Sequence, residues 1–279
     1  MLTEVQKKYY GGFFSMVLDP TIERRIEGDS VKFTTSLKIA NADRHLLNHV
    51  NSVFPGRINP RYKDPEPGDE QSWFWKRGKA NQCLDLIKEV EPYLILKKAQ
   101  IQAFKHFILI RQGLTGVDQD RRLQELTAEW EVFQLSRSQT IRRIYLPQRP
   151  VMAGIFDAKV PMGIFKTTHQ NGNPFEEYKA QAAITSVHLG LLKGIHRRFG
   201  GSRPREADDR PNRYQKPSYE WQLQGSGLLE FLWYIGPFSI LRKPEIELTK
   251  EFLQAKQNPS TTPADLESYL TRWEQLKAA

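Results

Sequence analysis

The chain contains a single cysteine, Cys83, among its 279 residues. One thiol can form neither a disulfide within the chain nor a cysteine-based metal site, so the disulfide-bonded folds of small secreted proteins are excluded. Apolar side chains at Leu84, Leu86 and Ile87 predict that this thiol is buried rather than reactive.

Long apolar runs are missing as well. No stretch reaches the roughly 18 consecutive apolar residues typical of a membrane-spanning helix. The segment from Met1 to Lys8 lacks the apolar stretch of a secretion signal. We therefore expect a soluble intracellular protein, in the cytoplasm or an organelle interior, that is not secreted and has no membrane partner.

Motifs for nucleotide and metal chemistry are also absent. The chain has no Gly-Lys-Ser or Gly-Lys-Thr sequence, and Gly200-Gly201 lacks the glycine spacing of a phosphate-binding loop. His45 and His49 have the i, i+4 spacing of paired metal ligands, but the glutamate of a metalloprotease helix does not accompany them. We interpret them as a surface histidine pair and predict no metal site.

The chain does have positive charge and enough apolar material for a core. Lysine and arginine total 41 against 32 acidic residues, which gives a net charge of +9, and hydrophobic residues make up 39%. This apolar fraction is typical of folded domains, and the basic balance favours a polyanionic partner such as nucleic acid. At roughly 100 to 200 residues per domain, the length favours two domains.

The second half of the chain repeats the first. Three pairs of segments match in the same order, at offsets of 142, 145 and 145 residues, and each pair shares small, aromatic or basic residues at equivalent positions. Conserved order and spacing predict two copies of one structural unit. The paired segments are Tyr10–Val17 with Met152–Lys159, Val53–Gly56 with Arg198–Gly201, and Glu91–Lys98 with Gly236–Lys243.

Each copy has the same series of predicted elements, in the order αββαββα. A short helix with small residues leads into two strands around a glycine-containing turn, then a helix, further strand material and a third helix. The first copy has strands at 21–27 and 31–39, a helix at 43–53, a strand at 72–76 and a helix from about 79. The second has strands at 160–168 and 178–186, a helix at 187–199, a strand at 219–223 and a helix from about 227.

Residues 118–144, between the copies, combine alternating charges with Leu123, Leu126, Trp130 and Phe133 at helical spacing. This pattern predicts an amphipathic helix that packs as well as links. We therefore divide the chain into an N-terminal repeat at 1–112, a helical linker at 113–150 and a C-terminal repeat at 151–279.

Two such repeats, each headed by a helix with small residues, resemble the single-chain LAGLIDADG homing endonucleases and the related RNA maturases. Tyr10–Leu18 and Met152–Val160 are similar to the signature motif, and the second, Met-Ala-Gly-Ile-Phe-Asp-Ala-Lys-Val, matches it more closely. The resemblance covers about residues 9 to 257. It implies an α+β fold in which two pseudo-symmetric αββαββα repeats form a saddle of antiparallel sheets along the major groove of double-stranded DNA.

The resemblance also places a catalytic centre at the ends of the two signature helices. In active members the eighth motif residue is Asp or Glu and holds a divalent metal, whereas this chain has Val17 and Lys159 there. Valine has no donor atom, and an ammonium group repels a cation. The sixth residues are Ser15 and Asp157, of which Asp157 is expected to be structural. Asp19, two residues past Val17, would restore one carboxylate to the centre if the first signature helix ended differently. We expect no cofactor, since only an active nuclease would need Mg²⁺.

Lys97 and Arg242 fall, by the repeat register, where the family places a lysine that stabilises charge on the phosphate. We interpret them as phosphate-contacting residues, and the alternative is a solvated basic face shared with Lys98 and Lys243. With these cations kept and both metal-binding acids replaced, the chain is predicted to be a pseudo-enzyme that holds a nucleic-acid backbone without cutting it.

Strand alternation predicts which side chains meet the nucleic acid, because residues two apart share one face of a sheet. A register one residue out would move the whole set to the core face. The Pro- and Arg-rich stretch 202–217 is predicted to order on a phosphate backbone. The predicted contacts are Lys32, Thr34, Ser36, Lys38, Arg57, Asn59 and Arg61 in the first repeat, and Lys166, Thr168, Lys179, Gln181, Arg203, Arg205, Arg213, Gln215, Gln222 and Gln224 in the second.

Three functions fit the sequence. The favoured one is a non-cleaving binder of double-stranded DNA or structured RNA, such as a maturase-like splicing or ribonucleoprotein factor, acting as a monomer with internal pseudo-two-fold symmetry. The second is an active, site-specific endonuclease for double-stranded DNA that uses unconventional metal ligands. The third is a protein-interaction scaffold, whose affinity for nucleic acid would depend little on salt.

Overall fold

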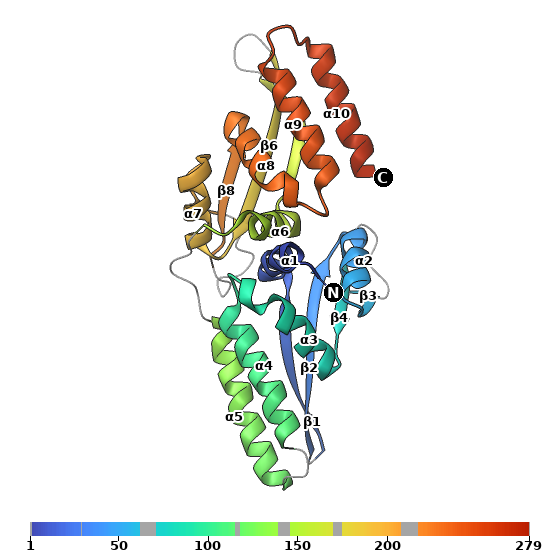
Figure 1. Cartoon of the computed structure of the whole chain (residues 1–279), viewed down its shortest axis with the longest axis vertical. Coiled ribbons are helices and arrows are strands. Elements are labelled where there is room, and N and C mark those ends of the chain that lie inside the picture. The colour runs from blue at the N-terminus through green and yellow to red at the C-terminus, as the bar shows by residue number, and fades with distance from the viewer. Residues whose placement is uncertain are drawn as a thin grey trace. The chain divides into compact units, whose positions relative to one another are not determined.

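A computed structural model describes residues 2–28, 30–61, 71–114, 118–138, 146–169, 175–207 and 217–278 (Figure 1). The chain divides into two compact units, unit 1 at 1–140 and unit 2 at 141–279. Each unit combines helices with one antiparallel four-stranded sheet, so the predicted α+β class is confirmed. Within the described ranges, no helix has both the length and the apolar character needed to cross a membrane.

Unit 1 begins with helix α1 (Glu4–Val17), which starts at a capping box formed by Thr3 and Gln6. The elements after α1 follow the order predicted from the sequence, and a long helix, α4, is added after the third helix. They are β1 (Asp19–Glu27), β2 (Ser30–Asn41), α2 (Arg44–Val53), β3 (Arg57–Pro60), β4 (Trp73–Arg77), α3 (Ala80–Val90), the 3-10 turn η1 (Glu91–Tyr93), α4 (Lys98–Gly113) and α5 (Gln119–Ser138).

Unit 2 repeats this series with the same sheet topology. The strand order is β1-β2-β4-β3 in unit 1 and β5-β6-β8-β7 in unit 2. The predicted αββαββα order is therefore confirmed in both units, while α4, α9 and α10 lie beyond it and were not predicted. The elements of unit 2 are α6 (Arg149–Lys159), β5 (Met162–His169), β6 (Phe175–Ser186), α7 (Leu189–Phe199), β7 (Arg205–Glu206), β8 (Tyr219–Gln224), α8 (Gly225–Ile235), η2 (Gly236–Phe238), α9 (Lys243–Gln257) and α10 (Pro263–Ala278).

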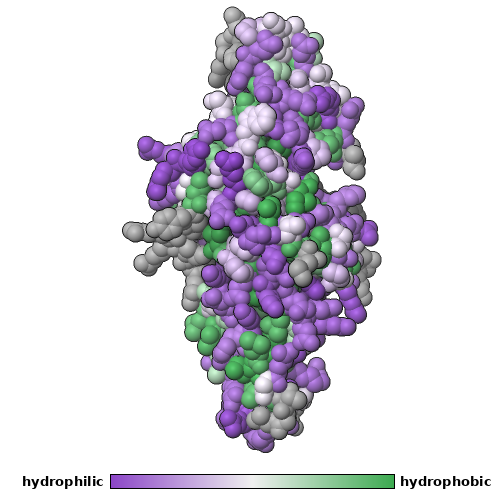
Figure 2. Space-filling view, in the orientation of Figure 1, coloured by the Kyte–Doolittle hydropathy of each residue, from purple (hydrophilic) through white to green (hydrophobic). Residues whose placement is uncertain are grey.

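The amphipathic helix predicted between the repeats is α5, which lies alongside α4 (Figure 1). Phe133 is fully buried against Phe104 of α4, and the Trp130 indole N–H donates to the carbonyl of Ile22 in β1 at 3.2 Å. Apolar surface remains visible over the α4–α5 end of unit 1 in Figure 2, and Val132 and Leu135 of α5 are among the exposed apolar residues. The segment 113–150 thus divides between the two units, and α5 packs as part of unit 1.

One tryptophan anchors the sheet of each unit through the same contact. Trp75 and Trp221 are fully buried, and their indole N–H groups donate to the carbonyls of Phe54 at 3.1 Å and Gly200 at 2.9 Å. The two acceptors follow the last residues of α2 and α7. Equivalent side-chain contacts at equivalent places confirm the internal repeat.

Helices cover only one face of each sheet. In unit 1, Leu37, Ile39 and Trp75 have no exposed surface, and the ring of Phe33 contacts Phe107 of α4. In unit 2, Ala182, Ile184 and Trp221 are fully buried in the same way. Alternate residues of these strands project to the opposite face.

Candidate nucleic-acid interface

The open face of each sheet is the side opposite these buried residues. Strand register defines its members, because residues directly opposite one another on neighbouring strands project to the same side. In unit 1 the open face comprises Asp19, Thr21, Glu23, Arg25, Glu27, Ser30, Lys32, Thr34, Ser36, Lys38, Ala40, Arg57, Asn59, Phe74 and Lys76. In unit 2 it comprises Gly163, Phe165, Thr167, Glu177, Lys179, Gln181, Ala183, Thr185, Arg205, Glu220, Gln222 and Gln224.

The register predicted for unit 1 agrees with the structure. All six of the predicted strand residues lie on the open face, and five of them have exposed surface, whereas Ser36 is buried. Arg61 is exposed just beyond β3, and its backbone N–H donates to the carbonyl of Ser72 at 2.8 Å. The strand residues are Lys32, Thr34, Ser36, Lys38, Arg57 and Asn59.

In unit 2 the predicted register is right for β6 and β8 and wrong for β5. Lys166 and Thr168 were expected to share a face with Lys179 and Gln181, but they pair with Tyr178 and Glu176 and lie on the helix-covered side. Phe165 and Thr167 take the open-face positions instead. The residues whose predicted face is confirmed are Lys179, Gln181, Gln222 and Gln224.

The contacts of Lys166 explain this difference. Its ammonium lies over the ring of Tyr178, 5.4 Å from the ring centre, and forms ion pairs with Glu176 at 2.9 Å and with Glu267 of α10 at 3.4 Å. The Glu176 carboxylate raises the pKa of Lys166 above its ordinary value. A long lysine side chain can therefore occupy the helix-covered side while its charge stays near solvent and acids.

The basic stretch after α7 is only partly described. Arg203 is exposed, and Arg205 of β7 lies opposite Glu220, with which it forms an ion pair at 3.3 Å. Arg213 and Gln215 lie outside the described residues.

The open faces of the two units differ in charge. Unit 1 carries five cations against the carboxylates of Asp19, Glu23 and Glu27, of which Glu27 forms an ion pair with Lys32. Glu23 pairs with Lys38 at 2.8 Å and with Arg25 at 3.1 Å, and the hydrogen bond from Lys38 lowers the pKa of Glu23. In unit 2 the open face carries three glutamine amides, one pair of which is linked by a 2.6 Å hydrogen bond from Gln224 Nε2 to Gln181 Oε1.

Lys76 and Arg25 belong to the open face but were missed from the sequence. Lys76 belongs to β4. It pairs with Lys38 of β2 on one side and with Arg57 of β3 on the other. The available signal was local, because Lys76 lies between buried Trp75 and buried Arg77 and therefore points the other way.

The two predicted phosphate-contacting cations reach the ends of the signature helices of their own units. The Lys97 ammonium donates to the carbonyl of Leu18, one residue past α1, at 2.7 Å. The Arg242 guanidinium donates through Nε to the carbonyl of Asp157, near the end of α6, at 3.3 Å. Equivalent residues of the two repeats thus place positive charge at the C-terminal ends of α1 and α6.

Ser15 and Asp157 tie the signature helices to the turns that precede α4 and α9. Ser15 Oγ accepts from the backbone N–H of Ile95 at 2.9 Å. The fully buried carboxylate of Asp157 accepts from the Ser239 hydroxyl at 2.7 Å and from the backbone N–H groups of Ile240 and Leu241 at 2.9 Å. The predicted structural role of Asp157 is confirmed.

The residues at the helix ends do not fit a divalent metal. Val17 offers no donor atom, Lys159 is a cation, and the Asp157 carboxylate is committed to the turn before α9. Asp19 forms an ion pair with Arg137 of α5 at 3.7 Å. Among the side chains described, no three or more His, Cys, Asp or Glu residues cluster in a way that suits a metal ion.

The histidine pair of α2 also has a local explanation. The ring nitrogen Nε2 of His49 is 2.9 Å from the hydroxyl of Tyr10, and the two rings stack. His45 is exposed at the first turn of the helix, where its backbone N–H donates to Asp43.

Two repeats with the same strand order, headed by helices that carry the signature positions, define the fold of the single-chain LAGLIDADG homing endonucleases. Solved structures with this fold match nearly the whole chain. I-SmaMI bound to cleaved DNA has 13% identity over 97% of this chain and 96% of that chain, with a TM-score of 0.71. I-GzeII in complex with its DNA target has 14% identity over 96% and 97%, with a TM-score of 0.68. I-CpaMI bound to uncleaved DNA has 14% identity over 96% and 98%, with a TM-score of 0.66.

These structures establish the fold alone. Sequence identities of this size carry no information on activity. No family model matches the sequence. No curated protein matches it either.

Proposed function

We propose that the chain binds nucleic acid on the open faces of its two sheets and does not cut it. The observation that carries this proposal is the same at both signature-helix ends: Lys97 donates to the carbonyl of Leu18 and Arg242 to the carbonyl of Asp157, while the eighth motif positions are Val17 and Lys159. Cations that attract a phosphate are present, and the positions where the resemblance expects metal-binding acids hold none. The three similar structures were solved with DNA bound, which favours DNA as the partner.

The two units contribute different parts of the binding. Open-face cations of unit 1, such as Lys38, Lys76 and Arg57, supply attraction to the phosphate backbone. The amides of Gln181 and Gln224 in unit 2 supply donors and acceptors suited to base edges in the major groove. Because one chain carries both faces, we propose that it acts as a monomer.

The test is binding to a random-sequence DNA duplex and to a structured RNA across a salt series, with Mg²⁺ or Mn²⁺ added to parallel samples. We expect affinity to fall steeply with salt, with a log–log slope near −0.9 for each phosphate neutralised on duplex DNA, and the substrate to stay intact. Lys38→Gln with Lys76→Gln should weaken binding and flatten the slope. The matched control is Lys88→Gln with Lys277→Gln, which removes two exposed charges from α3 and α10.

Each contrary result selects another function. Metal-dependent cut products would overturn the non-cleaving assignment and establish an active endonuclease. Affinity that does not change with salt, or no binding, would favour the protein-interaction scaffold. Tighter binding to the structured RNA than to the duplex would point to RNA rather than DNA as the partner and would favour a maturase-like role.

A further inference from the structure

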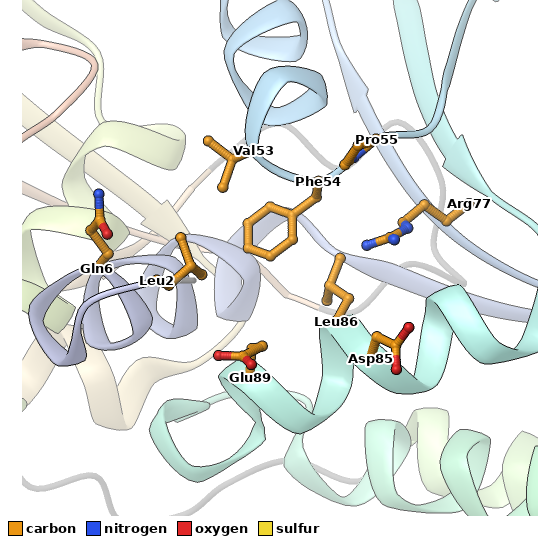
Figure 3. Close-up of a pocket in the computed structure, with 9 residues that line it drawn as sticks. All are labelled: Leu2, Gln6, Val53, Phe54, Pro55, Arg77, Asp85, Leu86 and Glu89. Carbon is orange, nitrogen blue, oxygen red and sulfur yellow. The ribbon is translucent and has the colours of Figure 1, made fainter.

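Unit 1 contains a cavity of about 390 Å³ on the helix-covered side of its sheet (Figure 3). It lies among the start of α1, the end of α2 and the side of α3, and its walls include Val53, Phe54 and Leu86. Its polar lining residues are Gln6, Arg77, Asp85 and Glu89, so an apolar wall and charged groups face the same space, and small-molecule sites combine these two features. The cavity is separate from the open face. Arg77 is the residue of β4 that lines it, and Arg77 pairs with buried Leu37, so both project to the helix-covered side of the sheet.

Arg77 is the unusual residue of this cavity. Only 8% of its surface is exposed, its Nε is buried without a hydrogen-bond partner, and no ion pair joins it to any described residue. Figure 3 shows its guanidinium directed toward the centre of the cavity, between Pro55 and Leu86. Burial lowers the pKa of Arg77, yet a guanidinium stays charged in proteins.

None of the described neighbouring groups forms an ion pair with this guanidinium. Burial raises the pKa of the Cys83 thiol to about 11, so the thiol is uncharged near neutral pH. Asp85 is exposed at the rim and forms no ion pair with Arg77, and the carboxylate of Glu89 lies 2.8 Å from the ammonium of Lys7. Asp85 acts on Arg77 through charge at longer range, and the buried Nε of Arg77 has no acceptor among the described residues, which is unfavourable.

We propose that the cavity binds a small monocarboxylic acid with an apolar body, whose carboxylate pairs with Arg77. The planar guanidinium fork matches a carboxylate with two parallel hydrogen bonds. Phe54, Val53 and Leu86 cover the apolar body. Asp85 at the rim adds negative charge, which disfavours a phosphate dianion and nucleic acid more than a single carboxylate.

The experiment compares four probes of matched size or charge: octanoate, octanamide, octylamine and inorganic phosphate. Binding is measured by calorimetry and by the shift in unfolding temperature, on the full chain without nucleic acid. We expect octanoate to bind and to raise the unfolding temperature, while the other three bind at least tenfold more weakly. Arg77→Met should lose the preference for octanoate over octanamide, and Lys88→Met, which removes an exposed charge from α3, should keep it.

Stability without ligand separates a binding role from a structural one. Because Arg77→Met replaces an unpaired buried charge with an apolar chain, we expect its unfolding temperature to equal or exceed that of the wild type. A second variant, Arg77→Lys, keeps the charge but loses the fork and should bind octanoate at least threefold more weakly. Equal affinity for octanoate and octanamide, undiminished octanoate binding in both variants, or no octanoate binding to the wild type would each overturn the proposal.

Discussion

Lys97 donates a 2.7 Å hydrogen bond from its ammonium to the carbonyl of Leu18, which directly follows the last residue of α1. To make this contact Lys97 adopts a φ of 59°, and among the described residues it is the one non-glycine with positive φ. Its repeat equivalent Arg242 reaches the carbonyl of Asp157 near the end of α6. Unit 1 therefore tolerates a strained backbone at Lys97, where the ammonium meets the C-terminus of α1. The C-terminal end of a helix favours positive charge.

Lys97→Gly should separate backbone strain from function. Glycine adopts positive φ without cost, which offsets the lost hydrogen bond, so we expect the free energy of unfolding to change by no more than about 1 kcal/mol. Nucleic-acid affinity should fall, and the salt slope should flatten by about one phosphate contact. Urea unfolding and the salt series measure the two effects.

Lys98→Ala provides the control for that variant, because Lys98 is the exposed cation next along the chain. Its effect on affinity should be clearly smaller. An equal loss in both variants would show that the segment acts as a solvated basic face and that Lys97 has no particular role.

Gln224→Ala tests the base-reading role of the open face of unit 2. The variant removes the donor to Gln181 and one of two neighbouring amides, and glutamine pairs well with adenine in the major groove. We expect a loss of preference of about 1–3 kcal/mol at one base pair, with non-specific binding unchanged. Selection from randomised duplexes measures the preference. Gln275→Ala on exposed α10 should leave it unaltered, and an unaltered preference in Gln224→Ala would argue against base reading there.

Adjacent glycines after α7 should differ sharply in their tolerance of alanine. Both have positive φ, 74° at Gly200 and 81° at Gly201. A Cβ at Gly200 meets nothing within 4 Å, whereas a Cβ at Gly201 overlaps the carbonyl oxygen of Gln222. Gly200→Ala should therefore cost about 1–3 kcal/mol from backbone strain alone and Gly201→Ala clearly more, as measured by chemical denaturation. Similar losses would mean that the strand carbonyl shifts freely.

The single thiol offers a probe of unit 1 with a definite pH dependence. Burial raises the pKa of Cys83 from 9.0 to about 11, so the folded state disfavours the thiolate. Above pH 9 the unfolded chain releases the proton and the folded chain retains it, so stability falls as the pH rises toward 11. Between pH 8 and pH 10 the urea midpoint of the wild type should decrease more than that of Cys83→Ala. Parallel decreases would show that the thiol titrates alike in both states.

Sequence patterns predicted the repeat and its elements because their causes are local. Alternation in β2 separates buried Leu37 and Ile39 from Lys32 and Lys38. The spacing of 145 residues between Pro92 and Pro237 indicated the internal repeat. The same alternation was available in β5, where Lys166 continues the row of buried Met162 and Ile164. That row was misassigned because a lysine among apolar residues reads as exposed, while here α10 supplies Glu267 as its partner.

The sequence by itself determined the α+β class, the two copies of αββαββα, the presence of Val17 and Lys159 rather than acids at the two equivalent helix ends, and the basic balance of the chain. These features depend on residue type and on short-range periodicity. Tertiary structure alone decided the face of Lys166, the approach of Lys97 to Leu18, and the isolation of Arg77 within a cavity. Each of those depends on which elements, distant in the chain, pack against one another, and packing sets the charge and solvent that a side chain meets.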